Sequence, residues 1–362
     1  MSMQRTAVIG AGIAGLTVAL RRATAGDRVV LFEAGPRVGG QLSSERRDGL
    51  VIEHGAEGFV ARSEAVPALA VEAGIADHVV EQLEHRSFRF DGSALLELTP
   101  GEAGRLLGFQ VPADELGRGI RSFWQGMAEL PERLALALGG QVELRLNSAV
   151  KSVAPHSGGV TVLDADGKAH EFSGAVIATT ARSSAALLGD AFGATARGLQ
   201  ESSLLSSLTV TLAFARESIA HPLEGTGFIV PEPERLGGVR AVTFCSSKLP
   251  NRAPPDRVLL RAFFRPSDHD LRALSDGAWA ERTERALGRA LPLTGPVLHA
   301  FVSRWANALP VFDDAHRARV AALEGALIGR GIWLAGAAFH GSGIDAAIRS
   351  AENAALAISS RS

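Results

Sequence analysis

The sequence is poor in residues that cross-link a fold or bind metals. Its 362 residues include one cysteine, Cys245, which excludes an intramolecular disulfide and a cysteine-based zinc site. A chain with a single cysteine suits a reducing compartment, so we expect a cytoplasmic location. The ten histidines contain no pair with the close spacing of a zinc motif, and we therefore expect no metal site.

The sequence also lacks an excess of either charge and has no long apolar run. The 37 basic residues nearly balance the 39 acidic ones, whereas nucleic-acid binding needs a basic excess, so we expect no nucleic-acid partner. No apolar run reaches the roughly eighteen residues of a spanning helix. Residues 1–5, which precede the first apolar run, are too few for a signal peptide. We expect about two domains and no integral membrane segment.

What is present begins with a dinucleotide-binding pattern. The apolar run 6–9 leads into Gly10-Ala11-Gly12-Ile13-Ala14-Gly15, then a helical stretch, then a second strand, 28–32, that ends at Glu33. A G-x-G-x-x-G motif between a strand and a helix, with an acidic residue after the next strand, is typical of a Rossmann unit. The sequence therefore predicts that this turn holds a dinucleotide.

Each motif residue has a physical role. Gly10 allows the tight turn, Gly12 lets the pyrophosphate approach the helix N-terminus, and Gly15 lets the helix pack close to the strand. Glu33 is expected to accept hydrogen bonds from ribose hydroxyls, and its charge would repel a 2′-phosphate. NADP is therefore not expected at this site.

A second glycine pair distinguishes FAD from NAD. In Glu33-Ala34-Gly35-Pro36-Arg37-Val38-Gly39-Gly40, the glycines let the chain run close along a long dinucleotide. This E-x3-R-x-G-G arrangement resembles the flavin amine oxidase and protoporphyrinogen oxidase superfamily, where it follows the Rossmann unit. The resemblance implies FAD as the cofactor.

The far end of the chain is expected to return to this cofactor. Residues 332–336 predict a buried strand, 337–343 a loop and 344–358 an alanine-rich helix. The free N–H groups at the start of that helix suit the negative charge that grows on a flavin ring during reduction.

The remaining patterns predict an α/β and α+β fold. Strands are expected at 142–150, 159–162 and 174–180, and a mostly antiparallel sheet is expected between residues 203 and 264, followed by a helix at 278–290. We therefore expect a discontinuous Rossmann-type FAD-binding domain and a second, substrate-binding domain. The first is predicted to comprise 1–83, 124–198 and 300–362, and the second 84–123 and 199–299.

Central motifs narrow the resemblance to the protoporphyrinogen oxidase family. The segments that carry it are 221–223, 225–231, 246–254, 304–310, His316 and 334–350. The resemblance covers nearly the whole chain in the family's order, and it implies which residues contact FAD. These are Gly10, Ala11, Gly12, Ile13, Ala14, Gly15, Glu33, Ala34, Arg37, Gly39, Gly40, Gln41, Gly55, Ala56, Glu57, Gly58, Val150, Trp305, Gly336, Ala337, Ser342, Gly343 and Ile344.

The chain departs from the family in one long segment. Family members carry a helical insert that covers the substrate tunnel and contacts the membrane, between the strand near Phe88 and the segment resembling 123–127. Here only residues 100–122 fill that interval. The insert is largely missing, so neither a porphyrinogen-sized tunnel nor membrane docking follows from the resemblance.

Three residues are candidates for contact with the substrate. The family often places a carboxylate-binding arginine where this chain has Ser87, and Arg89 lies two residues on, where strand alternation returns it to the same face; it either substitutes or faces solvent. Phe228 is expected in the sheet that roofs the flavin. His340 either touches the ring or the substrate, or is a loop histidine bonded to backbone. No side chain is assigned as a catalytic base.

The predicted activity is that of an FAD-dependent oxidase acting on a small molecule. A reduced, cyclic, tetrapyrrole-like substrate would pass a hydride to flavin N5, with reoxidation by oxygen or another acceptor. One alternative is an FAD-dependent amine oxidase or desaturase of a specialised biosynthetic pathway, which the missing insert favours. Another is a flavin-binding protein without turnover. No feature predicts the oligomeric state.

Overall fold

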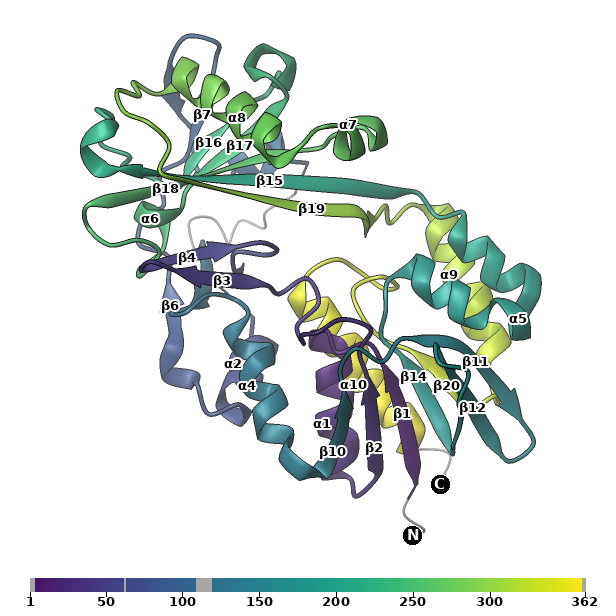
Figure 1. The fold of residues 1–362 in the computed structure, drawn as a ribbon. Helices are drawn as coiled ribbons and strands as arrows, with labels where there is room; N and C mark the ends of the chain where they lie inside the picture. The colour runs from purple at the N-terminus through teal and green to yellow at the C-terminus, as the bar shows by residue number, and fades with distance from the viewer. Residues whose placement is uncertain (1–3, 62, 109–118, 360–362) are drawn as a thin grey trace.

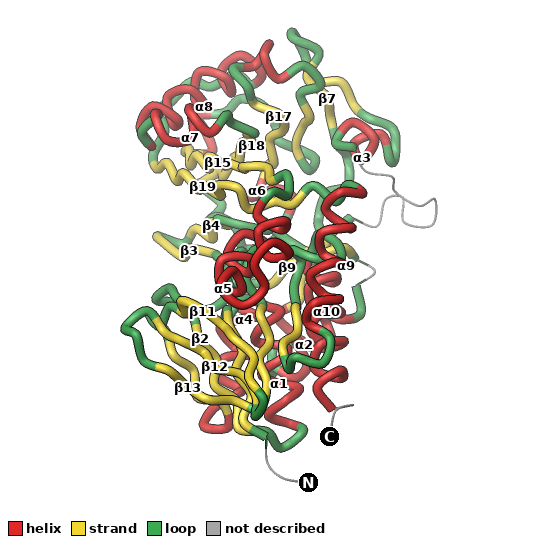
Figure 2. Tube along the Cα trace, turned by 90° about the vertical axis from the view of Figure 1, so that its right-hand side faces the viewer, coloured by secondary structure: helices red, strands yellow, loops and turns green. Residues whose placement is uncertain are grey.

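The computed structural model describes residues 4–61, 63–108 and 119–359. Two layered regions stand end to end, one built on a parallel sheet and the other on a seven-stranded sheet (Figures 1 and 2). Part of the short segment 100–122, residues 109–118, lies outside the described residues. The predicted α/β and α+β fold is confirmed.

The first region is built on a five-stranded sheet in which every neighbouring pair is parallel. Its strands are mostly apolar because both faces of the sheet are covered, except the edge strand 142–145, which alternates apolar and charged residues. Along the first strand, Ala7 and Ile9 face one hydrophobic core and Val8 faces the other. In spatial order the strands are β10 (Val142–Arg145), β2 (Arg28–Phe32), β1 (Arg5–Ile9), β14 (Gly174–Ile177) and β20 (Ile332–Leu334).

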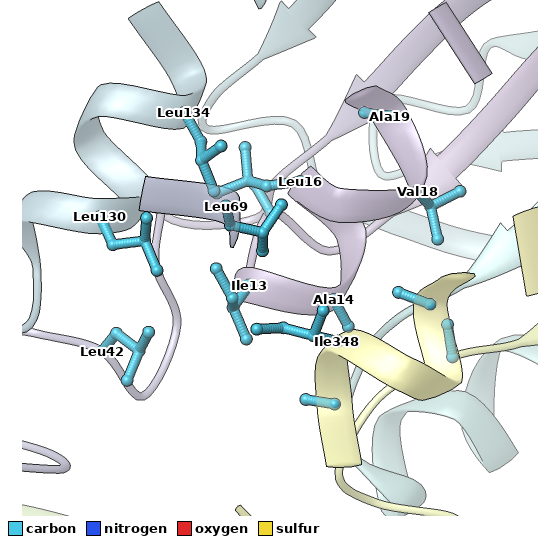
Figure 3. Close-up of a cluster of buried hydrophobic side chains, with 14 of the residues drawn as sticks. Ile13, Ala14, Leu16, Val18, Ala19, Leu42, Leu69, Leu130, Leu134 and Ile348 are labelled. Carbon is cyan, nitrogen blue, oxygen red and sulfur yellow. The ribbon is translucent and has the colours of Figure 1, made fainter. Parts of the chain in front are cut away.

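Helices from both ends of the chain cover one face of this sheet. Ile13 and Ala14 pack beside Ile348, which brings the glycine-rich turn and the C-terminal helix together (Figure 3). The helices on this face are α1 (Ile13–Thr24), α2 (Ala65–Glu72), α4 (Glu129–Leu138) and α10 (Ile344–Ser359), and α1 lies side by side with α10.

The other face carries a small antiparallel sheet and two helices. These elements are β11 (Val150–His156), β12 (Gly159–Asp164), β13 (Ala169–Phe172), α5 (Ala181–Gln200) and α9 (Asp314–Leu327). The single strand expected at 142–150 is wrong. The chain ends β10 at Arg145, turns at Asn147 with a φ of +51°, and starts β11 at Val150. Asparagine tolerates this left-handed conformation, which the alternation of apolar residues did not reveal.

The second region is a seven-stranded, mostly antiparallel sheet. In spatial order its strands are β19 (His299–Pro310), β15 (Leu204–Ala215), β18 (Arg257–Phe264), β17 (Val239–Phe244), β16 (Gly227–Ile229), β7 (Phe88–Phe90) and β8 (Leu95–Glu97). Its outer face packs on α7 (Asp268–Ala273) through Leu271 and on α8 (Asp276–Ala290) through Trp279 and Leu287. Because β19 pairs with β15, residues 300–310 lie in this sheet, across the predicted domain boundary at 300. The domain division otherwise stays a prediction.

The remaining elements are short. They are β3 (Ser44–Arg47) with β4 (Leu50–Glu53), β5 (Phe59–Val60) with β9 (Ile120–Phe123) and β6 (Val79–Glu81), the helices α3 (Glu102–Leu106) and α6 (Cys245–Lys248), and 3-10 turns at Ala76–His78, Gly139–Gln141, Arg216–Ser218 and Pro233–Leu236. Among them, β3, β4, β6 and α6 lie between the two regions (Figure 1). The buried Arg252 connects the segment after α6 to β9, because its guanidinium donates to Ser122 Oγ at 2.7 Å and to the Phe123 carbonyl at 3.2 Å.

Candidate functional site

The turn before α1 leaves open space where a ligand would lie. A Cβ added at Gly15 would lie 1.8 Å from the Gly10 carbonyl oxygen, so this approach of helix to turn requires glycine. A Cβ added at Gly12 would meet nothing within 4 Å. No side chain caps α1 and no acidic residue lies in its first turn. The free N–H groups of this helix therefore suit an anionic ligand such as a pyrophosphate.

Backbone donors hold Glu33 at the end of β2. Its Oε2 accepts a hydrogen bond from Ala11 N at 2.8 Å, and its Oε1 accepts one from Gly35 N at 2.9 Å. An ionised carboxylate has about four acceptor positions, so two remain for the hydroxyls of a ribose. Ser148 N donates to the Glu33 carbonyl at 2.8 Å, which brings the segment before Val150 to the same place.

The second glycine pair runs beside the first. Gly39 N donates to the Ala11 carbonyl at 2.8 Å, and a Cβ on Gly40 would lie 3.4 Å from Gly12 Cα. Arg37 braces this turn by donating to the carbonyls of Val38 at 3.1 Å and Gly40 at 3.0 Å. The turn predicted to follow the dinucleotide thus lies against the turn predicted to bind its phosphates.

The loop before α10 closes on the same helix. Gly336 has a φ of +120°, and a Cβ there would lie 3.6 Å from Ala14 Cβ. Its N–H donates to Ser350 Oγ at 3.1 Å. Ser342 and Gly343 are exposed at the start of α10, and a Cβ on Gly343 would meet nothing within 4 Å. A second helix start is therefore open near the first, and unlike α1 it carries an acidic residue in its first turn, Asp345, which pairs with Ser63 and Arg349.

The segment 55–58 continues the row of adjacent turns toward the second region. A Cβ on Gly55 would lie 1.7 Å from the Gln41 carbonyl oxygen, so the two turns touch. Trp305 Nε1 donates to the His54 carbonyl at 2.7 Å, which places the indole at the same junction. The structure thus brings the predicted cofactor residues together along one path, while their role in binding stays a prediction.

A buried charge cluster lies behind this segment. Arg261 donates to the Gly55 carbonyl at 2.7 Å, and Glu57 pairs with Lys248 and, at 3.9 Å, with Arg261. Burial alone would raise the pKa of Glu57, but the charges of Lys248 and Arg261 lower it below its usual value. The Nε and Nη1 atoms of Arg261 are buried without a hydrogen bond to a described residue, which suits a ligand that offers acceptors.

A cavity of about 440 Å³ opens beneath the seven-stranded sheet. Strand alternation turns Ile229, Ala241, Thr243 and Phe263 toward it, and Glu57 and Lys248 line it from the cofactor side. Ser87 and Thr226 also line it, with their hydroxyl oxygens 2.8 Å apart. Half of the residues that line the cavity are polar or charged, so an apolar wall faces groups that can bind a polar part of a small molecule.

The three substrate-side candidates do not gather in this cavity. Phe228 contributes to its lining, but its ring is 2% exposed and packs in the sheet's outer core, 6.3 Å from the ring of Phe90 and 6.1 Å from that of Phe244. Arg89 lines a separate cavity of about 90 Å³. His340 is exposed and lies 2.7 Å from Glu324 of α9. Their predicted contacts with the substrate remain untested.

Two arginines that the sequence did not single out line the same cavity, namely Arg240 and Arg265. The alternation Arg261-Ala262-Phe263-Phe264-Arg265 is the one signal that points to Arg265, because it repeats the face of Arg261. No comparable signal exists for Arg240, because the pairing of β17 with β18 shifts its register between Val239 and Ala241.

Other features of the described chain bear on the chemistry. Within residues 4–61, 63–108 and 119–359, no group of three histidine, cysteine or acidic side chains is arranged to hold a metal ion. Over the same ranges no helix is long and apolar enough to cross a membrane. Burial raises the pKa of the Cys245 thiol to about 12, so it is protonated at neutral pH.

Comparison with known families matches two parts of the chain. Residues 88–359 match the family described as flavin containing amine oxidoreductase. Residues 8–73 match the NAD(P)-binding Rossmann-like domain. The Rossmann-like match includes the end of β1 and all of β2 in the parallel sheet, and the amine oxidoreductase match includes the seven-stranded sheet together with β10, β14 and β20 of the parallel sheet.

Individual relatives are porphyrinogen oxidases. A coproporphyrinogen III oxidase of Bacillus subtilis (strain 168) is 23% identical over 444 residues, which cover 93% of this chain and 94% of the relative. Since that aligned region is longer than this chain of 362 residues, the relative carries segments that this chain lacks. The Staphylococcus aureus (strain NCTC 8325 / PS 47) coproporphyrinogen III oxidase is 36% identical over 110 residues, covering 30% of this chain and 22% of the relative.

Solved structures share the fold. A "Putative protoporphyrinogen oxidase" from Exiguobacterium sp. 255-15 superposes with a TM-score of 0.84 at 23% identity, over 100% of both chains. Cyclohexylamine oxidase from Brevibacterium oxydans IH-35A superposes with a TM-score of 0.77 at 15% identity, over 99% of both chains. At these identities the likeness concerns the fold alone.

Proposed function

The chain belongs to the flavin containing amine oxidoreductase family and is a flavin-dependent oxidoreductase, and we propose that its flavin is FAD. FAD is a dinucleotide, and the path from Gly12 through Glu33 and Gly40 to Gly55 supports a ligand of that length. FMN lacks the adenosine half, so it would leave the two remaining acceptor positions of Glu33 unused. The flavin accepts, when bound, the hydride that the substrate loses.

The residues of this chain fit the proposed ligand. The first turn of α1 would hold the pyrophosphate, since neither a cap nor an acidic side chain competes for its N–H groups. Glu33 would bind the ribose hydroxyls of the adenosine half, with Val150 near the adenine. The start of α10 at Ser342, Gly343 and Ile344 would face the ring and favour negative charge there.

We propose a porphyrinogen-type substrate in the cavity of about 440 Å³, with oxygen or another acceptor completing the cycle. The observation that carries this proposal is the similarity, over nearly the full length of both chains, to a coproporphyrinogen III oxidase. The apolar face of Ile229, Ala241 and Phe263 supports contact with a flat ring, and the protein's part is to orient that ring and exclude water. A cytoplasmic location is part of this proposal.

A specific observation favours a second candidate. The chain lacks segments that the Bacillus relative carries, and amine-oxidising enzymes share its fold. A small amine or another substrate with an activated C–H bond would need less cover than a tetrapyrrole. The absence of tyrosine means that any aromatic cage for an amine would be built from phenylalanine and tryptophan.

Two experiments test the cofactor and distinguish the candidate functions. Heat release of the cofactor from the purified yellow protein, followed by chromatography and mass measurement, is expected to give FAD; FMN or no flavin would overturn the cofactor proposal. An anaerobic panel of porphyrinogens, amines and dihydroaromatic compounds is then scored by loss of flavin absorbance. Reduction by porphyrinogens supports the first candidate, and reduction by amines or dihydroaromatics alone supports the second. If dithionite reduces the flavin but no substrate does, the protein binds flavin without turnover.

A further inference from the structure

We propose that Arg240 and Arg265 bind a carboxylate of the substrate at the outer end of the cavity. The inference rests on the proposed function, because it assigns a substrate to the cavity beneath the seven-stranded sheet. It adds to that function two residues that select a substrate with an anionic arm.

The backbone aims both side chains at the same space. Arg265 directly follows β18 and continues the face of Arg261 and Phe263, which lies toward the cavity. Arg240 lies at the register shift of β17, beside the end of β18, and irregularities of this kind redirect a side chain. Two strands therefore deliver two guanidinium groups to one end of the cavity.

The two charges lack compensation. Neither guanidinium has a hydrogen bond or an ion pair with a described residue, whereas Lys248 and Arg261 at the inner end both face Glu57. Burial and the neighbouring positive charge of Arg240 lower the pKa of Arg265. Two like charges held together without an acid are stabilised when an anion binds between them. Guanidinium groups also match the two oxygens of a carboxylate.

The position of this pair sets the size of the ligand. Arg261 contacts Gly55, which we place near the flavin ring, and Arg265 follows four residues later along the same strand direction. At about 3.3 Å per residue the two lie roughly 13 Å apart. A substrate that reaches the arginines while its reacting carbon faces the flavin therefore spans about that distance. A propionate-bearing tetrapyrrole has this reach, and a short amine does not.

Arg240 and Arg265 replace Arg89 as the candidates for contact with a substrate carboxylate. Arg89, the candidate on β7, lines the separate cavity with Arg235 and Glu232. Arg240 is half-buried and Arg265 is exposed at the rim. We therefore assign the inner anion contact to Arg240, where less water competes, and the outer contact to Arg265.

The test measures binding without turnover. Holoprotein is titrated with coproporphyrin III, which carries four carboxylates, and with its tetramethyl ester, using porphyrin fluorescence. A second pair, 2-naphthoate and 2-naphthamide, is followed by the change in flavin absorbance. The wild type is expected to bind each carboxylate about tenfold more tightly than its neutral counterpart, because charged hydrogen bonds to the guanidinium groups are lost with the charge.

Substitutions test whether Arg240 and Arg265 cause the preference for carboxylates. Arg240→Gln and Arg265→Gln are each expected to weaken carboxylate binding several-fold and the double variant to abolish the preference, while affinity for the neutral probes stays unchanged. Arg285→Gln is the matched control, since Arg285 is 72% exposed on α8 with its nearest acid, Glu281, at 3.8 Å. Equal flavin content and melting temperature show that each variant is folded.

The outcomes separate this inference from the proposed function. A wild type without carboxylate preference in either pair overturns the inference, as does a double variant that keeps the preference. Preference for naphthoate without any porphyrin binding supports the arginine pair and overturns the tetrapyrrole substrate. Porphyrin binding with equal affinity for acid and ester leaves the proposed function standing and rejects the pair.

Discussion

The parallel-sheet region and the seven-stranded region present different atoms to the open space beside them. In the first, the groups that face open space are backbone N–H donors at the start of α1 and α10, and glycines permit the close approach. In the second, charged side chains and an apolar strand face line the cavity. Backbone donors recognise a phosphate whatever side chains surround them, whereas side chains are specific to one substrate. Under the proposed function, the cofactor would therefore be held mainly by backbone groups and the substrate mainly by side chains.

The largest effect on FAD binding is expected when a side chain is introduced into the open space at the start of α1. Gly12→Val should weaken FAD binding more than about a hundredfold, because the valine would occupy the pyrophosphate position and block charge-assisted hydrogen bonds. The apoprotein should keep its melting temperature, since a Cβ at Gly12 meets no atom within 4 Å. Flavin absorbance per mole of protein and a thermal melt check both statements.

Gly15→Ala is the matched control for that prediction. Its Cβ would lie 1.8 Å from the Gly10 carbonyl oxygen, so it should destabilise the fold with or without flavin. A Gly12→Val protein that binds FAD normally would contradict the placement of the cofactor.

The second prediction compares the two faces of the seven-stranded sheet. Phe228→Ala should lower the free energy of unfolding by about 3–5 kcal/mol, because its ring fills the outer core. Phe263→Ala should cost less stability and weaken substrate binding more, since Phe263 is half-buried on the cavity face. Urea unfolding and a substrate titration of both variants test this. A larger stability loss for Phe263→Ala would reverse the assignment of faces.

The third prediction concerns the charge cluster between the regions. Glu57→Gln should lower the free energy of unfolding by about 3 kcal/mol at neutral pH, because Lys248 and Arg261 would lose their buried partner. The pKa of Glu57 is lowered in the folded protein, so its contribution is present above the ordinary value near 4.5 and is lost as pH falls through the folded value. Urea titrations of wild type and variant at neutral and acidic pH should therefore converge toward acid. A difference that grows toward acid would refute this sign.

The smallest effect is expected at Cys245. Because burial raises the pKa of its thiol to about 12, the native protein should react with a thiol reagent far more slowly than the urea-unfolded protein. Cys245→Ser should leave the flavin spectrum unchanged. Rapid labelling of the folded protein would show that the surroundings of Cys245 are more open than the structure indicates.

Residues whose roles depend on local spacing were predictable from the sequence. The glycine turn, Glu33 and the loop before α10 lie within a few residues of the strands that carry them, so a pattern along the chain fixes their place. The structure places these segments side by side, as the contacts of Gly12 with Gly39 and of Gly336 with Ala14 show.

The orientation of the substrate-side residues could not be predicted from the sequence, because it depends on which face of each strand another element covers. Phe228 and Ile229 alternate, and the sequence does not reveal that α8 covers the face of Phe228. Arg240 faces the cavity because of a register shift with no local signature. The split of 142–150 into two strands of different sheets likewise follows from tertiary packing around Asn147.

The most direct test of the whole account is anaerobic mixing of the purified holoprotein with coproporphyrinogen III. We predict that flavin absorbance falls, because the flavin takes up two of the six electrons that the porphyrinogen must lose. Porphyrin fluorescence should appear only after oxygen or another acceptor is admitted, restores the oxidised flavin and permits the further turnovers. A flavin that stays oxidised with this porphyrinogen and with protoporphyrinogen, yet is reduced by dithionite, would contradict the proposed reaction.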